Sequence, residues 1–115
     1  MDNDLYLKIS SSTKQTFNHA NKLIQKNLRV LYMDNGLSHS RIAIQSSKKA
    51  VKLAVTRNRI RRTIRESFRS ILTELPPYDM LVLITSKISS EKHEISDILM
   101  QEWILSIKSL QQYQS

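Results

Sequence analysis

The sequence contains no cysteine, one glycine and two prolines. The lack of cysteine excludes disulfide bonds and thiolate metal sites, and it agrees with a reducing cytoplasm. No apolar run approaches the length that is needed to span a bilayer. The acidic start Met1-Asp2-Asn3-Asp4 lacks the basic-then-apolar order of a signal peptide. We therefore expect a cytoplasmic protein that does not contact membranes.

Clusters of metal-binding or catalytic side chains are also lacking. The ten acidic residues are dispersed, and the three histidines, His19, His39 and His93, do not share a ligand spacing. A protein-only nuclease needs clustered acids to hold its metal ions, so this sequence disfavours that class. We expect no catalytic residue and no metal site in the protein itself.

Positive charge is abundant, and it is concentrated in one place. The segment from Lys48 to Arg69 contains nine basic residues and one acid, Glu66, so its surplus of eight equals the formal net charge of the whole chain, +8. Six of the nine are arginines, whose planar guanidinium groups suit phosphates and stack on bases. A localised basic block indicates a polyanionic partner, and we interpret the 115 residues as a single nucleic-acid-binding domain in which residues 1–11 are expected to be disordered.

The first half of the chain is predicted to contain one helix and two strands. Residues 12–25 are predicted to form a helix that Ser12 caps, because apolar residues recur in it at helical spacing. Residues 28–33 are predicted to form a strand. Asn35-Gly36 is typical of a hairpin turn, so residues 41–46 are predicted to return as the partner strand.

A longer helix is predicted from residue 55 to residue 75, where Pro76-Pro77 ends it. At about 100° per residue, Arg61, Arg65 and Arg69 form a row one turn apart, with Arg62 beside it. This row flanks an apolar stripe that consists of Ile60, Ile64, Phe68, Ile71 and Leu75. One edge of the helix is therefore expected to pack inward while its neighbour displays guanidinium groups.

The rest of the chain predicts a strand and a final helix. The unbroken apolar run at 80–85 is typical of a central strand that is buried on both faces. Residues 91–111, capped by Ser90, are predicted to form a helix whose stripe includes Trp103 as a core residue. Helices and strands in this order indicate the α+β class, with helices packed on a mixed sheet.

The basic segment 47–69 closely resembles the signature of the bacterial ribonuclease P protein subunit, whose basic helix is often called the RNR motif. Here the pair Lys48-Lys49 is followed by a short linker and then by Arg57-Asn58-Arg59. The similarity extends upstream through residues 41–44 and downstream through Glu74-Leu75-Pro76, and it covers roughly residues 41–110.

This resemblance implies a fold and a function. The implied fold is an αβββαβα two-layer sandwich with a mixed sheet and a left-handed βαβ crossover, an exception to the right-handed rule. The implied catalyst is an RNA, which the protein binds together with precursor tRNA, and the Mg²⁺ ions are bound mainly by that RNA. By motif position the family's RNA contacts fall on Lys49, Arg57, Asn58, Arg59, Arg61, Arg62 and Arg65, and the charge of the segment adds Lys48, Lys52 and Arg69.

The resemblance also implies a cleft on the sheet for the 5′ leader of precursor tRNA. Phe17 matches the family's first-helix phenylalanine and Tyr32 its strand aromatic. Tyr32 shares a sheet face with Val30, because side chains two residues apart point the same way, and we expect this face to be open. Packing in the core is the alternative for both aromatics. The N-terminal third departs from the family pattern, since Asn21 stands where a second aromatic is expected.

A second function stays open beside the ribonuclease P subunit. It is a stand-alone RNA- or DNA-binding module, such as a ribosome-associated factor. Copurification of one structured RNA, rather than a mixture, would favour the subunit. No feature of the sequence indicates an obligatory protein partner.

Overall fold

The computed structural model describes residues 5–84 and 92–112. Helices and strands follow each other in the predicted αβββαβα order, with a short 3-10 helix, η2, inserted before the last strand. The elements are α1 (Thr13–Thr16), β1 (Asn21–Ile24), β2 (Arg29–Asp34), β3 (Arg41–Ser46), α2 (Ala54–Ser70), η2 (Leu72–Glu74), β4 (Tyr78–Ile84) and α3 (Lys92–Gln112). The α+β class is confirmed.

The strands form one mixed sheet in the order β1-β2-β4-β3. β2 pairs antiparallel with β1 and with β4, whereas β3 pairs parallel with β4. The prediction that residues 41–46 pair with residues 28–33 is therefore wrong, because β4 lies between them. Gly36 does adopt a positive φ of 69°, but the chain after this turn runs to β3, which is an edge strand of the sheet and is separated from β2 by β4. The unit β3–α2–β4 is a parallel crossover, and its hand stays a prediction.

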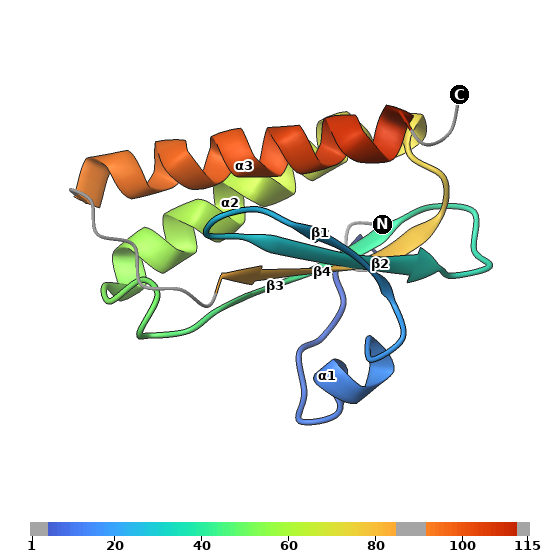
Figure 1. Cartoon of the computed structure of the whole chain (residues 1–115), viewed down its shortest axis with the longest axis horizontal. Coiled ribbons are helices and arrows are strands. Elements are labelled where there is room, and N and C mark those ends of the chain that lie inside the picture. Colours follow the sequence, from blue (N-terminus) through green and yellow to red (C-terminus); the bar gives the residue numbers. More distant parts are fainter. Residues whose placement is uncertain (1–4, 85–91, 113–115) are drawn as a thin grey trace.

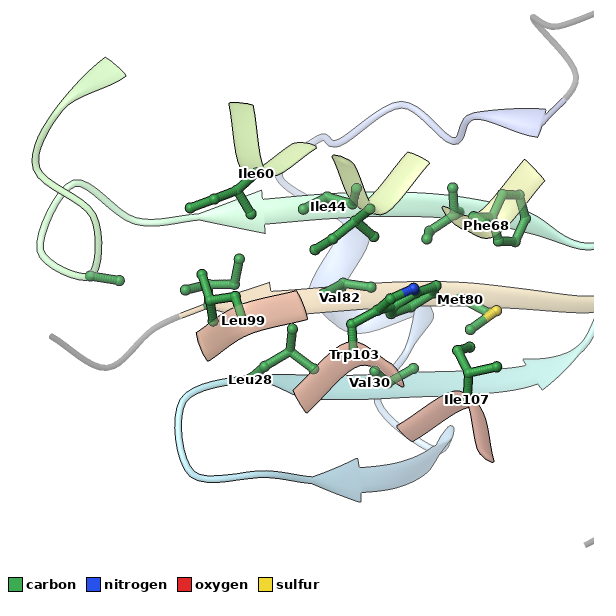
Figure 2. Packing of buried hydrophobic residues seen from close by; sticks show 14 of the residues in the cluster. Leu28, Val30, Ile44, Ile60, Phe68, Met80, Val82, Leu99, Trp103 and Ile107 are labelled. Atoms are coloured by element: carbon green, nitrogen blue, oxygen red, sulfur yellow. The ribbon is translucent and has the colours of Figure 1, made fainter. Parts of the chain in front are cut away.

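The main hydrophobic core lies between the sheet and the two long helices. α2 and α3 cover one face of the sheet, and α1 lies on the other (Figure 1). Figure 2 shows Ile60 and Phe68 of α2 and Leu99, Trp103 and Ile107 of α3 packed over the strands. Trp103 is fully buried, and its indole N–H donates a hydrogen bond to Ser67 Oγ (2.9 Å). The predicted core position of Trp103 is confirmed.

The helix that was predicted over residues 55–75 is shorter than expected. α2 ends at Ser70, and the chain continues through η2 before it reaches Pro76-Pro77. The predicted end of the strand at Thr85 and the predicted cap at Ser90 lie outside the described residues. None of the helices in the described residues is long and apolar enough to cross a membrane.

The N-terminal third differs most from the prediction. A helix over residues 12–25 is wrong: α1 spans four residues, and Asn21–Ile24 pairs with β2 as β1. A Gln25 N–H bond to Leu28 O (2.8 Å) closes this hairpin. The helical pattern depended on only three apolar residues, and strand pairing satisfies the same backbone groups while Leu23 packs against the main core. Asn21, which departs from the family pattern, lies in this strand.

Residues 5–7 extend the sheet at its β3 edge. Tyr6 forms a parallel bridge with Ile42, and the Leu7 N–H donates to Ile42 O (2.8 Å). Side chains alternate along this segment, so Tyr6 packs against the main core. Leu7 packs on the other face of the sheet, against a small apolar cluster that consists of Phe17, Leu31, Ala43 and Leu81. Residues 5–7 therefore have a defined place at the edge of the sheet, whereas disorder in residues 1–11 stays a prediction.

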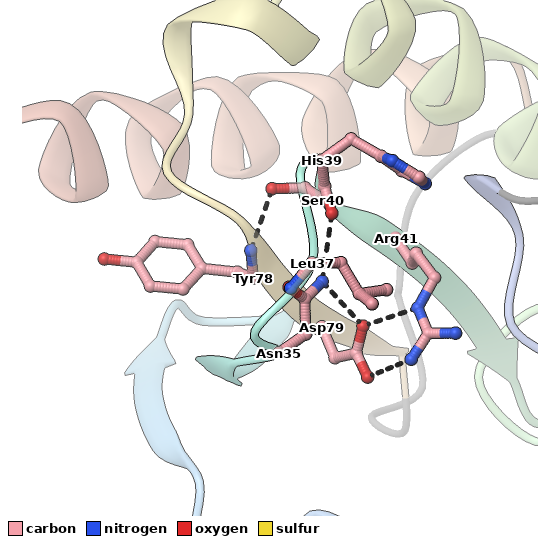
Figure 3. A network of polar contacts seen from close by, with 7 residues as sticks. All are labelled: Asn35, Leu37, His39, Ser40, Arg41, Tyr78 and Asp79. Carbon is pink, nitrogen blue, oxygen red and sulfur yellow. Dashed lines mark hydrogen bonds and ion pairs between the residues drawn. The ribbon is translucent and has the colours of Figure 1, made fainter.

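A half-buried polar network joins the starts of β3 and β4 (Figure 3). Asp79, which is 9% exposed, accepts hydrogen bonds from Arg41 Nε (2.8 Å), Arg41 Nη2 (2.7 Å) and Asn35 Nδ2 (3.1 Å). Burial raises the pKa of the Asp79 carboxyl, but the bonds from Arg41 and Asn35 and the guanidinium charge outweigh it, so the pKa lies below its ordinary value. Beside it, Ser40 Oγ–H donates to Pro76 O (2.7 Å) and accepts from the Tyr78 N–H (3.0 Å).

Candidate nucleic-acid interface

One flank of α2 displays basic side chains, as the sequence predicts. The neighbouring stripe, which contains Ile64 and Phe68, is fully buried against the sheet and so fixes the rotation of the helix. A depression of about 380 Å³ lies along the exposed flank, and Tyr6 and Glu66 contribute to its lining. Its other lining residues, which we call the basic flank, are Asn58, Arg61, Arg62, Arg65 and Arg69. Four guanidinium groups face a single carboxylate, so the depression favours a polyanion.

Within the basic flank, two arginines have defined partners in the described part of the chain. Arg61 Nη1 donates to Asn58 Oδ1 (3.1 Å), so the asparagine of the motif is bonded to the arginine row. The guanidinium carbon of Arg65 lies 4.6 Å from the ring centre of Tyr6, within the range of a cation–π interaction. Sequence reasoning missed Tyr6, because an isolated tyrosine that precedes the first element has no periodic pattern to mark it.

The remaining five predicted RNA-binding residues lie N-terminal to the depression or outside its lining. Lys48 and Lys49 are exposed on a turn that is anchored by buried Ala50 and Val51, where the Ala50 N–H donates to Ser47 Oγ (3.0 Å). Lys52 and Arg59 are exposed as well.

Arg57 is partly used by the fold. Its Nη1 donates to Val51 O (2.8 Å) and Lys52 O (3.0 Å), and these bonds clamp the start of α2 onto the preceding linker. The structure therefore gives Arg57 a positioning role toward the lysine turn. Any RNA contact that it makes uses the rest of its guanidinium group.

A second candidate surface lies on the sheet face opposite the long helices. Phe17, Leu31 and Leu81 are buried there beneath the α1 segment. A hollow of about 190 Å³, which we call the sheet groove, is lined by Phe17, Asn18, Lys22, Arg29, Leu31, Leu81 and Leu83. Its floor is apolar, and Lys22 and Arg29 bring positive charge to its rim. The predicted position of Phe17 beside a groove on the sheet agrees with this geometry.

The hairpin that carries the two cations of the sheet groove is anchored to α3. Buried Glu102 accepts a hydrogen bond from the Asn27 N–H at Oε1 (2.7 Å) and another from Asn27 Nδ2 at Oε2 (2.7 Å). This pair fixes the turn between β1 and β2, and with it Lys22 and Arg29. Sequence reasoning missed both cations. Alternation along β2 nevertheless places Arg29 on the same face of the sheet as Leu31.

Tyr32 does not belong to the sheet groove. It shares a face with Val30, as predicted, but that face is the one covered by α2 and α3, and Val30 is fully buried there. The Tyr32 ring makes an edge contact with Tyr78, with ring centres 5.1 Å apart. The prediction that Tyr32 and Phe17 line one open groove is therefore wrong. Both faces of this strand carry apolar residues, so alternation alone could not show which one the helices cover.

Comparison with known proteins identifies the family. A family model described as Ribonuclease P matches residues 1–104. The chain belongs to the ribonuclease P protein family. A curated relative, the ribonuclease P protein component of Idiomarina loihiensis, is 36% identical over 95 residues, which are 82% of this chain and 76% of the relative.

Solved structures of ribonuclease P proteins share the fold. A mutant of the Staphylococcus aureus RNase P protein superposes with a TM-score of 0.72 at 21% identity, over 98% of this chain and 90% of that chain. The RNase P protein from Thermotoga maritima has a TM-score of 0.66 at 23% identity, over 93% of this chain and 96% of that chain. The mixed sheet with two long helices on one face is thus the architecture of the ribonuclease P protein.

Proposed function

We propose that this protein is the protein subunit of ribonuclease P and binds the RNA subunit through the basic flank of α2 and the lysine turn before it. Family membership supports the association with ribonuclease P, and it favours this function over a stand-alone RNA-binding module. The observation that carries the proposal is the gathering of four arginines along one depression, because guanidinium groups suit phosphates.

The sheet groove is proposed to hold the single-stranded 5′ leader of precursor tRNA. Unpaired nucleotides bind where apolar or aromatic side chains receive bases and nearby cations receive phosphates. The groove combines both, with Phe17 and Leu31 in its lining and Lys22 and Arg29 at its rim. The groove and the basic flank lie on opposite faces of the sheet, so one small protein can contact both RNAs at once. Tyr32 has no part in this proposal.

Hydrolysis itself is assigned to the RNA subunit, whose Mg²⁺ ions would activate water and stabilise the developing charge. Within residues 5–84 and 92–112, no three histidine, aspartate or glutamate side chains lie close enough together to hold a metal ion. The role left to the protein is electrostatic and positional. Its cations lower the repulsion between two polyanions, and its groove restrains the leader relative to the catalytic RNA.

The RNA that copurifies with the protein tests this proposal. The wild-type chain is isolated under native conditions beside a variant in which Arg61, Arg62 and Arg65 are glutamine, and the bound RNA is sequenced. The proposal expects one structured RNA, the ribonuclease P RNA, with the wild type and its depletion with the variant. A broad mixture that both proteins bind equally would contradict it and favour a general RNA-binding module.

A further inference from the structure

The strand-like segment at residues 5–7 brings an aromatic ring to the basic flank. The Leu7 N–H bond to Ile42 O (2.8 Å) holds this segment against the edge strand β3. Alternation then directs Tyr6 toward α2, where it lines the same depression as the arginines. The ring is therefore fixed by the sheet and not by the helix that it contacts.

Arg65 is the arginine that this ring contacts. Its guanidinium carbon lies 4.6 Å from the ring centre of Tyr6. Its Nε is buried and donates no hydrogen bond within the described residues, and the residue also lines the depression. By contrast, Arg62 and Arg69 are exposed on the same flank.

An ordered arginine binds phosphate more tightly than a mobile one, because binding then costs less side-chain entropy. We propose that Tyr6 is a positioning residue, which holds the guanidinium of Arg65 in place for an RNA phosphate. This inference deepens the proposed function and rests on it. It assigns a role in RNA binding to the segment before α1, well outside the basic segment 48–69.

The test is a double-mutant cycle on binding of purified bacterial ribonuclease P RNA. The four proteins are the wild type, Tyr6→Leu, Arg65→Gln and the double variant. We expect Tyr6→Leu to weaken binding by about two- to fivefold, which is the typical strength of an exposed cation–π contact. In the Arg65→Gln background, the same change should have no further effect on the dissociation constant.

Two controls separate positioning from folding. Tyr6→Phe keeps the ring and should restore nearly wild-type binding, and Lys108→Gln removes an exposed charge from α3 and should leave the Tyr6→Leu effect intact. Circular dichroism melting confirms that each variant is folded at the assay temperature.

The outcomes also separate this inference from the proposed function. If Tyr6→Leu weakens binding equally with and without Arg65, the ring acts on its own and the positioning role is wrong. If Tyr6→Leu binds like the wild type, the inference also fails although the proposed function stands. If the wild type does not bind the RNA at all, the proposed function fails with it.

Discussion

Replacing Arg61, Arg62 and Arg65 with glutamine removes three of the four guanidinium groups from the depression on α2. Each cation that neutralises a phosphate contributes roughly 0.7–0.9 to the slope of log K against log salt concentration. For binding to ribonuclease P RNA, we therefore expect a slope that is shallower by about 2 to 3, since three such contacts are lost. Filter binding or fluorescence anisotropy over a series of salt concentrations measures this slope.

The fold should survive this triple substitution. The three arginines are absent from the buried core, and glutamine has nearly the helix propensity of arginine. The loss of the Arg65–Tyr6 contact costs about 0.5–1 kcal/mol, which is small beside the usual 5–15 kcal/mol of folding stability. A thermal melt near that of the wild type is therefore expected, so a change in slope reports the interface.

A matched control removes the same charge from other surfaces. Lys22, Arg29 and Lys108 are exposed, and none of them lines the basic flank. Changing all three to glutamine should leave the slope for the RNA subunit nearly unaltered, because none of them lines the depression in which the phosphates are proposed to bind. An unchanged slope in the α2 variant would remove this flank from the interface. Equal losses in both variants would show that net charge, and not its position, drives binding.

Three further predictions concern the core, the polar network and the sheet groove. Phe68→Ala should cost about 3–5 kcal/mol in urea unfolding, because a fully buried ring leaves a cavity; unaltered stability with lost RNA binding would show that this stripe faces RNA. The pKa of the Asp79 carboxyl in the folded state lies below its ordinary value of 3.8. The ionised carboxylate therefore stabilises the fold above pH 3.8, and this stabilisation is lost as the pH falls through the lowered pKa of the folded state. The stability gap between the wild type and Asp79→Asn should therefore narrow below pH 3.8, and a gap that stays constant there would refute the role of the Arg41–Asp79 pair. Changing Lys22 and Arg29 together to glutamine should weaken binding of precursor tRNA by the assembled ribonucleoprotein and spare mature tRNA; equal weakening of both would refute leader binding in the sheet groove.

The long helices could be predicted because their signals are local and repeated. The stripe through Ile64 and Phe68 recurs over about four helical turns of sequence, and the arginine row lies at a fixed angle beside it, so the flank follows from helix geometry alone. Most of β4 was predictable for a similar reason, since its run from Met80 to Ile84 is unbroken and apolar, as in a strand that is buried on both faces.

The strand order and the N-terminal third depend on contacts between distant residues. Nothing near Gly36 indicates that β4, more than forty residues later, displaces the expected hairpin partner of β2. Three apolar residues before Gln25 agree with a helix, but the pairing of β1 with β2 and the bonds from Asn27 to Glu102 are made with partners that local periodicity does not reveal.

Among the candidate site residues, too, those marked by a local pattern were predictable and those placed by distant contacts were not. The basic flank was predicted residue by residue, whereas Tyr6, Lys22 and Arg29 reach their surfaces through sheet pairing. Tyr32 was placed on the wrong surface, because alternation assigns side chains to two faces without showing which face the helices cover.

Reconstituted cleavage tests the central claim most directly. Purified protein, a bacterial ribonuclease P RNA and precursor tRNA are combined at a Mg²⁺ concentration too low for the RNA to act well alone, and release of the 5′ leader is followed over time. The proposed role predicts that the protein accelerates leader release by the RNA and releases none without it. Unchanged cleavage in its presence, or cleavage by the protein alone in Mg²⁺, would contradict the assignment as a non-catalytic subunit of ribonuclease P.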